Sequence, residues 1–171
     1  MLGSLLGLVA AGGLALSGCK QGGEAVPRAG DSFPDFLLPD LQGRPHDSRS
    51  YAGRPLLLNF WATWCPPCRN EMADLERLHQ ALAPKGLILL AVSLDQDLNL
   101  VREFVRHERL TMPVLVDANQ RWSRIALKMQ ELPSSFLVDT DFKIREVVAG
   151  ARLWADASVQ QALAGRLKLK I

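Results

Sequence analysis

The stretch LLLNFWATWCPPCRNEM, residues 56–72, predicts the centre of the fold. It opens with an apolar run broken only by Asn59, whose length fits a buried central strand. Pro66 or Pro67 then begins a helix, because the first helical turn does not need the N–H that proline lacks. Apolar residues continue this helix along one face, at Met72, Leu75, Leu78 and Leu82. The stretch therefore predicts a strand–turn–helix unit with two cysteines at the turn.

The rest of the chain alternates between strand-like and helix-like patterns. A proline-rich hairpin is expected over residues 33–49. Further strands are predicted at residues 87–93, 114–116, 135–138 and 143–148, and further helices at residues 97–107, 121–128 and 156–167. This alternation predicts an α/β fold in which helices cover both faces of a central β-sheet.

Cys65 and Cys68 can close a disulfide across the first turn of the predicted helix. Cys65 would lie at the helix N-terminus, where unpaired N–H groups and the macrodipole favour a thiolate. Cys68 would be more buried, and it would resolve the mixed disulfide that Cys65 forms. Pro66 and Pro67 carry no charge, so we expect a reduction potential nearer that of thioredoxin, about −270 mV, than that of a strong oxidant, about −120 mV.

Other uses of the two cysteines are less well supported. A zinc site needs about four ligands, and His46, His79 and His107 are scattered singly along the chain. A bridge with a purely structural role would close too short a loop to gain much stability. A Cu(I) site made by the two thiolates remains an alternative.

The N-terminus predicts export and lipidation. Residues 1–18 are apolar or small, as in a signal peptide, and they precede Cys19 in the pattern of a bacterial lipoprotein box. The basic residues that usually begin such a peptide are missing, and a buried N-terminal helix is the alternative. We predict a lipoprotein signal peptide at residues 1–18, a flexible tether at residues 19–29 and one domain at residues 30–171. A diacylglyceryl group on Cys19 would leave the other two cysteines as a pair.

The composition gives no sign of a nucleic-acid partner. The net charge is +2 and no run of Lys or Arg appears, so nucleic acid is not expected as a partner.

Outside the cytoplasm, no glutathione pool keeps thiols reduced. A dithiol enzyme in the envelope must therefore receive electrons from a membrane partner or work as an oxidant.

Residues 59–72 resemble the TlpA/ResA-type thiol–disulfide oxidoreductases, a branch of the thioredoxin superfamily. The resemblance runs from about Gly30 to the C-terminus. It includes Pro34-Asp35-Phe36, Gly53-Arg54-Pro55, Val92-Ser93-Leu94-Asp95 and the segment Met112–Asp117. It implies a thioredoxin-like fold, in which helices flank a central mixed β-sheet, with an N-terminal β-hairpin and a βα-type central insertion.

The resemblance also assigns roles to residues around the cysteines. Glu71 would tune proton transfer to them, and Asn59 stands where thioredoxin has a buried aspartate. Pro133 matches the superfamily's cis-proline, and Leu132 before it would contact substrate. Trp64 could stack on a bound peptide. The expected substrate-binding set is Trp64, Pro66, Pro67, Leu132 and Pro133.

The resemblance implies an envelope reductase without a cofactor other than the redox disulfide. Electrons would pass from a membrane donor of the DsbD/CcdA type to oxidised client proteins, such as apocytochromes c or proteins with copper-site cysteines. An oxidase or isomerase and a lipid-tethered copper-binding chaperone are the alternatives. A peroxidase of the peroxiredoxin branch would need threonine at the position of Ala62.

Overall fold

The computed structural model describes residues 26–169. The predicted signal peptide, residues 1–18, lies outside this range, as do Cys19 and most of the predicted tether at residues 19–29. The elements are, in chain order, β1 (Leu37–Pro39), β2 (Pro45–Asp47), the 3-10 helix η1 (Ser48–Tyr51), β3 (Leu56–Trp61), α1 (Pro66–Leu82), the 3-10 helix η2 (Ala83–Lys85), β4 (Ile88–Ser93), α2 (Leu98–His107), β5 (Val114–Val116), α3 (Arg121–Ala126), β6 (Ser134–Val138), β7 (Ile144–Ala149) and α4 (Ala157–Arg166).

Five strands form the main sheet in the order β5-β4-β3-β6-β7. Strands β3, β4 and β5 run parallel, whereas β6 is antiparallel to β3 and β7 is antiparallel to β6. Strand β3 lies at the centre, and every one of its residues is buried. The prediction of a mixed α/β sheet is therefore confirmed, and the apolar run of the sequence forms its middle strand.

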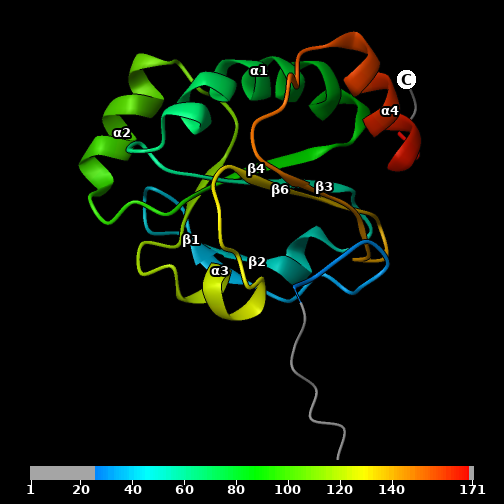
Figure 1. Ribbon diagram of the computed structural model, residues 1–171, viewed down its shortest axis with the longest axis horizontal. Helices are drawn as coiled ribbons and strands as arrows, with labels where there is room; N and C mark the ends of the chain where they lie inside the picture. The colour runs from blue at the N-terminus through cyan, green and yellow to red at the C-terminus, as the bar shows by residue number, and fades with distance from the viewer. Residues whose placement is uncertain (1–25, 170–171) are drawn as a thin grey trace, which may run out of the picture.

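The sheet separates two layers, which Figure 1 shows edge-on. Helices α1, α2 and α4 cover one face, and α3 lies with the β1–β2 hairpin on the other. Each layer has its own core. The first core includes Trp61, Met72 and Trp154, and the second is built around aromatic residues such as Phe60 and Phe136. Helices thus cover both faces, as predicted.

The N-terminal hairpin is present but shorter than predicted. Strands β1 and β2 pair with each other in a separate two-stranded sheet instead of extending the main one. Helix α3 is also shorter than the predicted 121–128. Lys128 has a φ of 50°, a left-handed conformation that cannot continue a helix, and Leu127 before it is fully buried.

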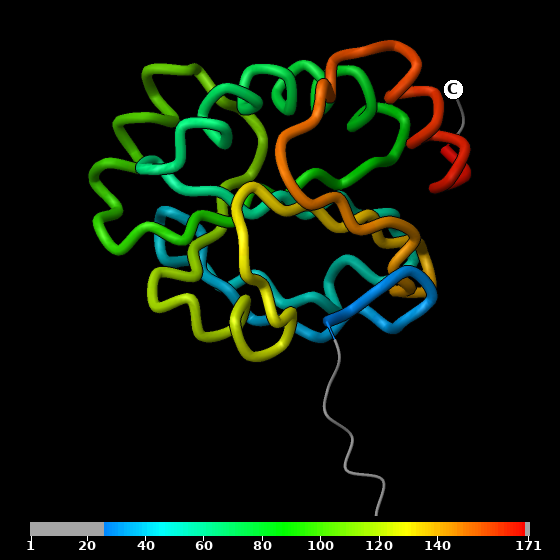
Figure 2. The backbone as a smooth tube through the Cα atoms, viewed as in Figure 1, coloured from blue at the N-terminus to red at the C-terminus, as the bar shows by residue number. Residues whose placement is uncertain are grey.

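Two segments cross between the layers near the start of α1. Figure 2 shows the chain after α3 rising to β6, and the chain after β7 continuing into the helical layer above the sheet. The first segment contains Leu132 and Pro133, joined by a cis peptide bond. The second segment begins at Gly150, whose N–H donates to the carbonyl of Pro133 at 2.9 Å. This bond holds both crossing segments together beside the cysteine pair.

Candidate active site

The two cysteines lie where β3 leads into α1, and they form a disulfide. Cys65 caps the helix: its Sγ accepts the N–H of Cys68 at 3.3 Å, and Pro66 and Pro67 fill the first turn. Cys65 is 5% exposed, whereas Cys68 is fully buried. The helix N-terminus stabilises negative charge on Cys65, because its N–H groups point toward the sulfur. This geometry favours Cys65 as the attacking sulfur and Cys68 as the resolving one.

A buried carboxylate holds the loop that precedes Cys65. Asp95, only 2% exposed, accepts the backbone N–H of Thr63 at 2.9 Å and the Thr63 hydroxyl at 2.5 Å. It also accepts the hydroxyl of Ser93 at 2.9 Å. Asp95 follows β4, the strand that pairs with β3. This cluster fixes the turn between β3 and α1, and its role was not predicted from the sequence.

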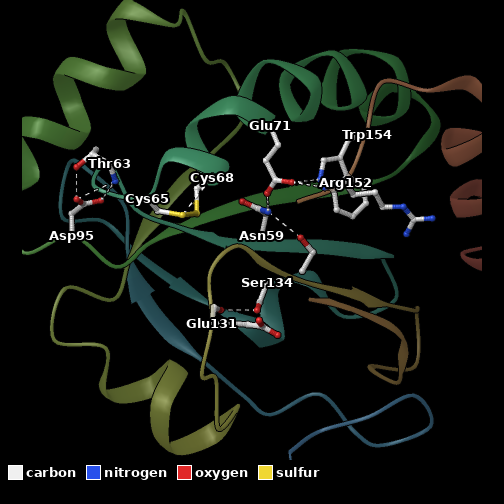
Figure 3. Close-up of a disulfide and its surroundings, with 11 residues drawn as sticks. Asn59, Thr63, Cys65, Cys68, Glu71, Asp95, Glu131, Ser134, Arg152 and Trp154 are labelled. Atoms are coloured by element: carbon white, nitrogen blue, oxygen red, sulfur yellow. Dashed lines mark hydrogen bonds between the residues drawn. A yellow bond between two sulfur atoms is a disulfide. The ribbon is translucent and has the colours of Figure 1, made fainter. Parts of the chain in front are cut away.

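A second buried carboxylate, Glu71, lies one turn beyond Cys68 on α1 (Figure 3). Its Oε1 accepts the side-chain amide of Asn59 at 2.8 Å. Its Oε2 accepts the backbone N–H of Arg152 at 3.0 Å and the indole N–H of Trp154 at 2.9 Å. The three donors come from β3 and from the crossing segment after β7, so both elements fix the position of this carboxylate.

Burial raises the pKa of Glu71 above the ordinary glutamate value, because the charged form is poorly solvated. The three donors favour the charged form and oppose this shift, but they do not cancel it. Asp74, on the same helix, adds a small effect in the raising direction. A carboxyl group with a raised pKa can take up and release a proton at a higher pH than an ordinary glutamate, which suits it to thiol chemistry.

Asn59 lies between Glu71 and the cysteine pair in Figure 3. Its amide nitrogen donates to Glu71 and, at 2.9 Å, to the hydroxyl of Ser135. Its Oδ1 is buried and has no hydrogen-bond partner among the residues that the structure describes. The amide cannot take up a proton as the aspartate of thioredoxin can, so Glu71 is the titratable group of this cluster.

An open pocket of about 650 Å3 adjoins Cys65. It is lined by Trp64, Cys65, Pro66, Leu94, Gln120, Ser123, Arg124, Met129, Gln130, Glu131 and Leu132. Trp64 is 62% exposed and Leu132 is half-buried, so both present apolar surface beside the attacking sulfur. Of the expected substrate-binding set, Trp64, Pro66 and Leu132 line this pocket. Pro67 is exposed outside it, and Pro133 is buried behind it.

Two further observations concern a metal site and a membrane-spanning helix. Within residues 26–169, no three side chains of His, Cys, Asp or Glu are grouped as they would be around a metal ion. The same residues contain no helix that combines the length and apolar character of a membrane span.

The chain matches known proteins in both sequence and structure. A sequence profile of the AhpC/TSA family covers residues 29–147. Thiol-disulfide oxidoreductase ResA of Geobacillus thermodenitrificans is 35% identical over 121 residues, which are 71% of this chain and 69% of that protein.

Solved structures agree with this match. A Chlorobium tepidum protein, provisionally assigned as thiol:disulfide interchange protein DsbE, has a TM-score of 0.75 at 27% identity, with 82% of this chain and 99% of that one covered. A secreted disulfide oxidoreductase of Mycobacterium tuberculosis, homologous to E. coli DsbE, has a TM-score of 0.62 at 26% identity, with 78% of this chain and 94% of that one covered.

The fold and the cysteine pair thus define a thiol–disulfide oxidoreductase with the thioredoxin fold. More narrowly, the chain belongs to the AhpC/TSA family and, through its ResA relatives, to the TlpA/ResA-like branch of the thioredoxin superfamily. The family and the fold inferred from the sequence are both confirmed.

Proposed function

We propose that this oxidoreductase works as a reductase of disulfides in client proteins of the bacterial envelope. The observation that supports this direction most is the helix start at Cys65, where two neutral prolines stand between the cysteines. No histidine lies there to stabilise the thiolate strongly, and strongly oxidising members of the superfamily depend on such stabilisation of the reduced form.

The reaction has two exchange steps. The Cys65 thiolate attacks a client disulfide, which forms a mixed disulfide and releases one client sulfur as a thiolate. Cys68 then loses its proton and attacks Cys65, which closes the Cys65–Cys68 disulfide and releases the second client sulfur. The pair gives up two electrons, and the client gains two thiols. We assign to Glu71 the uptake of the proton that Cys68 loses.

Regeneration requires an electron donor that can reach the envelope. We propose a membrane protein of the DsbD/CcdA type as the donor, and apocytochromes c or copper-site proteins as the clients. A diacylglyceryl group on Cys19, if the predicted lipoprotein box is used, would keep the domain at the membrane. Blocking lipoprotein processing should then leave a larger precursor in cells, and unchanged processing would contradict the lipid anchor.

The reduction potential and a trapping variant test the proposal together. We expect a potential near that of thioredoxin, about −270 mV, and a value near −120 mV would identify an oxidase instead. Cys68→Ala should hold clients on Cys65 as mixed disulfides in envelope extracts. Cys65→Ala is the matched control, because it lacks the attacking thiolate and should trap nothing. Equal recovery from both variants would exclude the proposed reaction.

A further inference from the structure

Trp64 separates the active-site pocket from a second hollow on the surface. The second groove has a volume of about 640 Å3 and lies between the start of α1 and α2. It is lined by Thr63, Trp64, Arg69, Leu100, Glu103, Phe104, Arg106 and His107. Trp64 and Leu100 are 62% and 51% exposed, so the groove presents a large apolar surface to solvent. Trp64 lines both hollows, so the second groove adjoins the active-site pocket at this residue.

The charges around the second groove are unbalanced. Arg69 and Arg106 are exposed, and neither guanidinium has a hydrogen-bond or ion-pair partner within residues 26–169. His107, which lines the groove, is paired at 3.0 Å with Glu108, which does not line it. Glu103 is the one carboxylate among the lining residues. Two unpaired cations among apolar lining residues favour a ligand that carries both apolar and acidic groups.

The reaction determines which molecule reaches this groove. A client that is joined to Cys65 has its own cysteine beside Trp64, because both residues line the first pocket. An extended polypeptide advances about 3.3 Å per residue, so a few residues carry it across one indole ring. One flank of the client cysteine can therefore lie in the first pocket while the other enters the second groove.

We propose that the second groove binds the client segment next to the reacting cysteine and selects segments that combine an apolar side chain with an acidic one. The apolar side chain would pack on Trp64 and Leu100. The acidic side chain would pair with Arg69 or Arg106. This inference rests on the proposed exchange reaction, and it defines the class of client rather than the direction of electron flow.

The test compares two synthetic peptides, each with an intramolecular disulfide and a phenylalanine beside one cysteine. They differ only in carrying two aspartates or two lysines next to that phenylalanine. The full chain, in its reduced form, is mixed with each peptide, and the exchange rate is followed by tryptophan fluorescence. We expect the acidic peptide to react about fivefold faster at low salt, with the ratio falling toward one at high salt.

Charge reversal on the protein gives the decisive comparison. Arg106→Glu should reverse the preference between the two peptides, whereas Lys85→Glu should leave the ratio of rates unchanged. Lys85 is exposed in η2, at the other end of α1, so this control makes the same change of charge far from the groove. If Arg106→Glu and Arg69→Glu both leave the ratio as it is in the parent protein, the proposal is wrong.

A small uncharged disulfide, 2-hydroxyethyl disulfide, separates this proposal from the proposed function. Exchange with this reagent but with neither peptide would exclude the groove as a client site while leaving the cysteine chemistry intact. Failure with the reagent as well would contradict the exchange reaction, and the groove proposal with it. A potential in the oxidising range would change the proposed direction alone, because the peptide preference holds for exchange in either direction.

Discussion

The indole N–H of Trp154 donates to Oε2 of Glu71 at 2.9 Å across a separation of 83 residues in the chain. The indole is fully buried, and the guanidinium of Arg152 lies 5.3 Å from its ring centre. Arg152 is in turn held by Glu146, at 3.1 Å, on β7. The proton affinity of the active-site carboxyl therefore depends on a segment far from the cysteines in sequence.

Trp154→Phe keeps an aromatic ring in the core and removes one hydrogen bond to the charged form of Glu71. A bond of this kind lowers the pKa of a carboxyl, so its loss should raise the pKa of Glu71 further. The midpoint of the pH–rate profile for exchange should move to higher pH. Trp122→Phe is the matched control, because it removes an indole bond to the carbonyl of Asp35 in the other layer. Equal shifts in both variants would contradict the assigned role of Trp154.

Glu71→Gln removes the titrating group and should flatten both the rate profile and the pH dependence of stability. The pKa of Glu71 is raised in the folded protein above its ordinary value of 4.5. Its contribution to stability is therefore fully present below about pH 4.5 and is lost as the pH rises through the folded pKa. Urea unfolding across pH 4–8 measures this loss. The decline should disappear in Glu71→Gln and persist in Asp141→Asn, on the β6–β7 turn.

Asn59→Asp places a second carboxyl beside Glu71 in the buried cluster. Two adjacent carboxylates cannot both ionise there cheaply, so the variant should lose stability as the pH rises. We expect a cost of about 3 kcal/mol at pH 8 and a smaller one at pH 5, both measured by urea unfolding. Ser135→Ala removes the other partner of the Asn59 amide and should cost about 1 kcal/mol at either pH. A penalty for Asn59→Asp that does not change with pH would contradict this interpretation.

Glu76 is a buried carboxylate on α1 that holds the loop before β5. It accepts the backbone N–H groups of Thr111 and Met112 at 2.8 and 3.1 Å. Burial alone would raise the pKa of Glu76, but the hydrogen bonds it accepts, first those of Thr111, together hold it below 4.5. Its contribution to stability is therefore present above about pH 4.5 and is lost as the pH falls through the folded pKa.

Glu76→Gln should lower the free energy of unfolding by about 2 kcal/mol at pH 7. The difference from the parent protein should shrink as the pH is lowered from 7 to 3, because the stabilising charge is lost as the pH falls through the folded pKa of Glu76. Thermal or urea unfolding at the two pH values measures it. Glu103→Gln, on the exposed face of α2, should change stability little at either pH. A cost for Glu76→Gln that is the same at pH 3 as at pH 7 would exclude the ionised form as the source of stability.

The sequence predicted the fold because its signals are local. The apolar run of β3, the prolines that open α1 and the alternation of elements each depend on neighbouring residues. The boundaries were less certain where the decisive contact lies elsewhere. The predicted helix at residues 121–128 has the right periodicity, but burial of Leu127 and the left-handed Lys128 end it early. The hairpin was predicted, whereas its separation from the main sheet was not.

Local spacing predicted the site only along α1, and the family resemblance added Asn59, Leu132 and Pro133 from other elements. The spacing of Cys65, Cys68 and Glu71 places them on successive turns of one helix. Trp154 and the backbone N–H of Arg152 could not be placed, because their contact with Glu71 depends on how the segment after β7 returns to the helical layer. The segment containing Asp95 belonged to the family resemblance, but nothing in the sequence showed that its carboxylate holds Thr63.

The burial of Cys68 behind Cys65 affects the order in which partners can react. One sulfur of the disulfide is reachable from solvent, so in the proposed cycle the client and the electron donor must both react with Cys65. The two cannot occupy that sulfur at once. Turnover should therefore follow ping-pong kinetics, in which the two substrates compete for the same face of the protein. A rise in the concentration of the client alone, or of the donor alone, would then slow the reaction of the other substrate with Cys65.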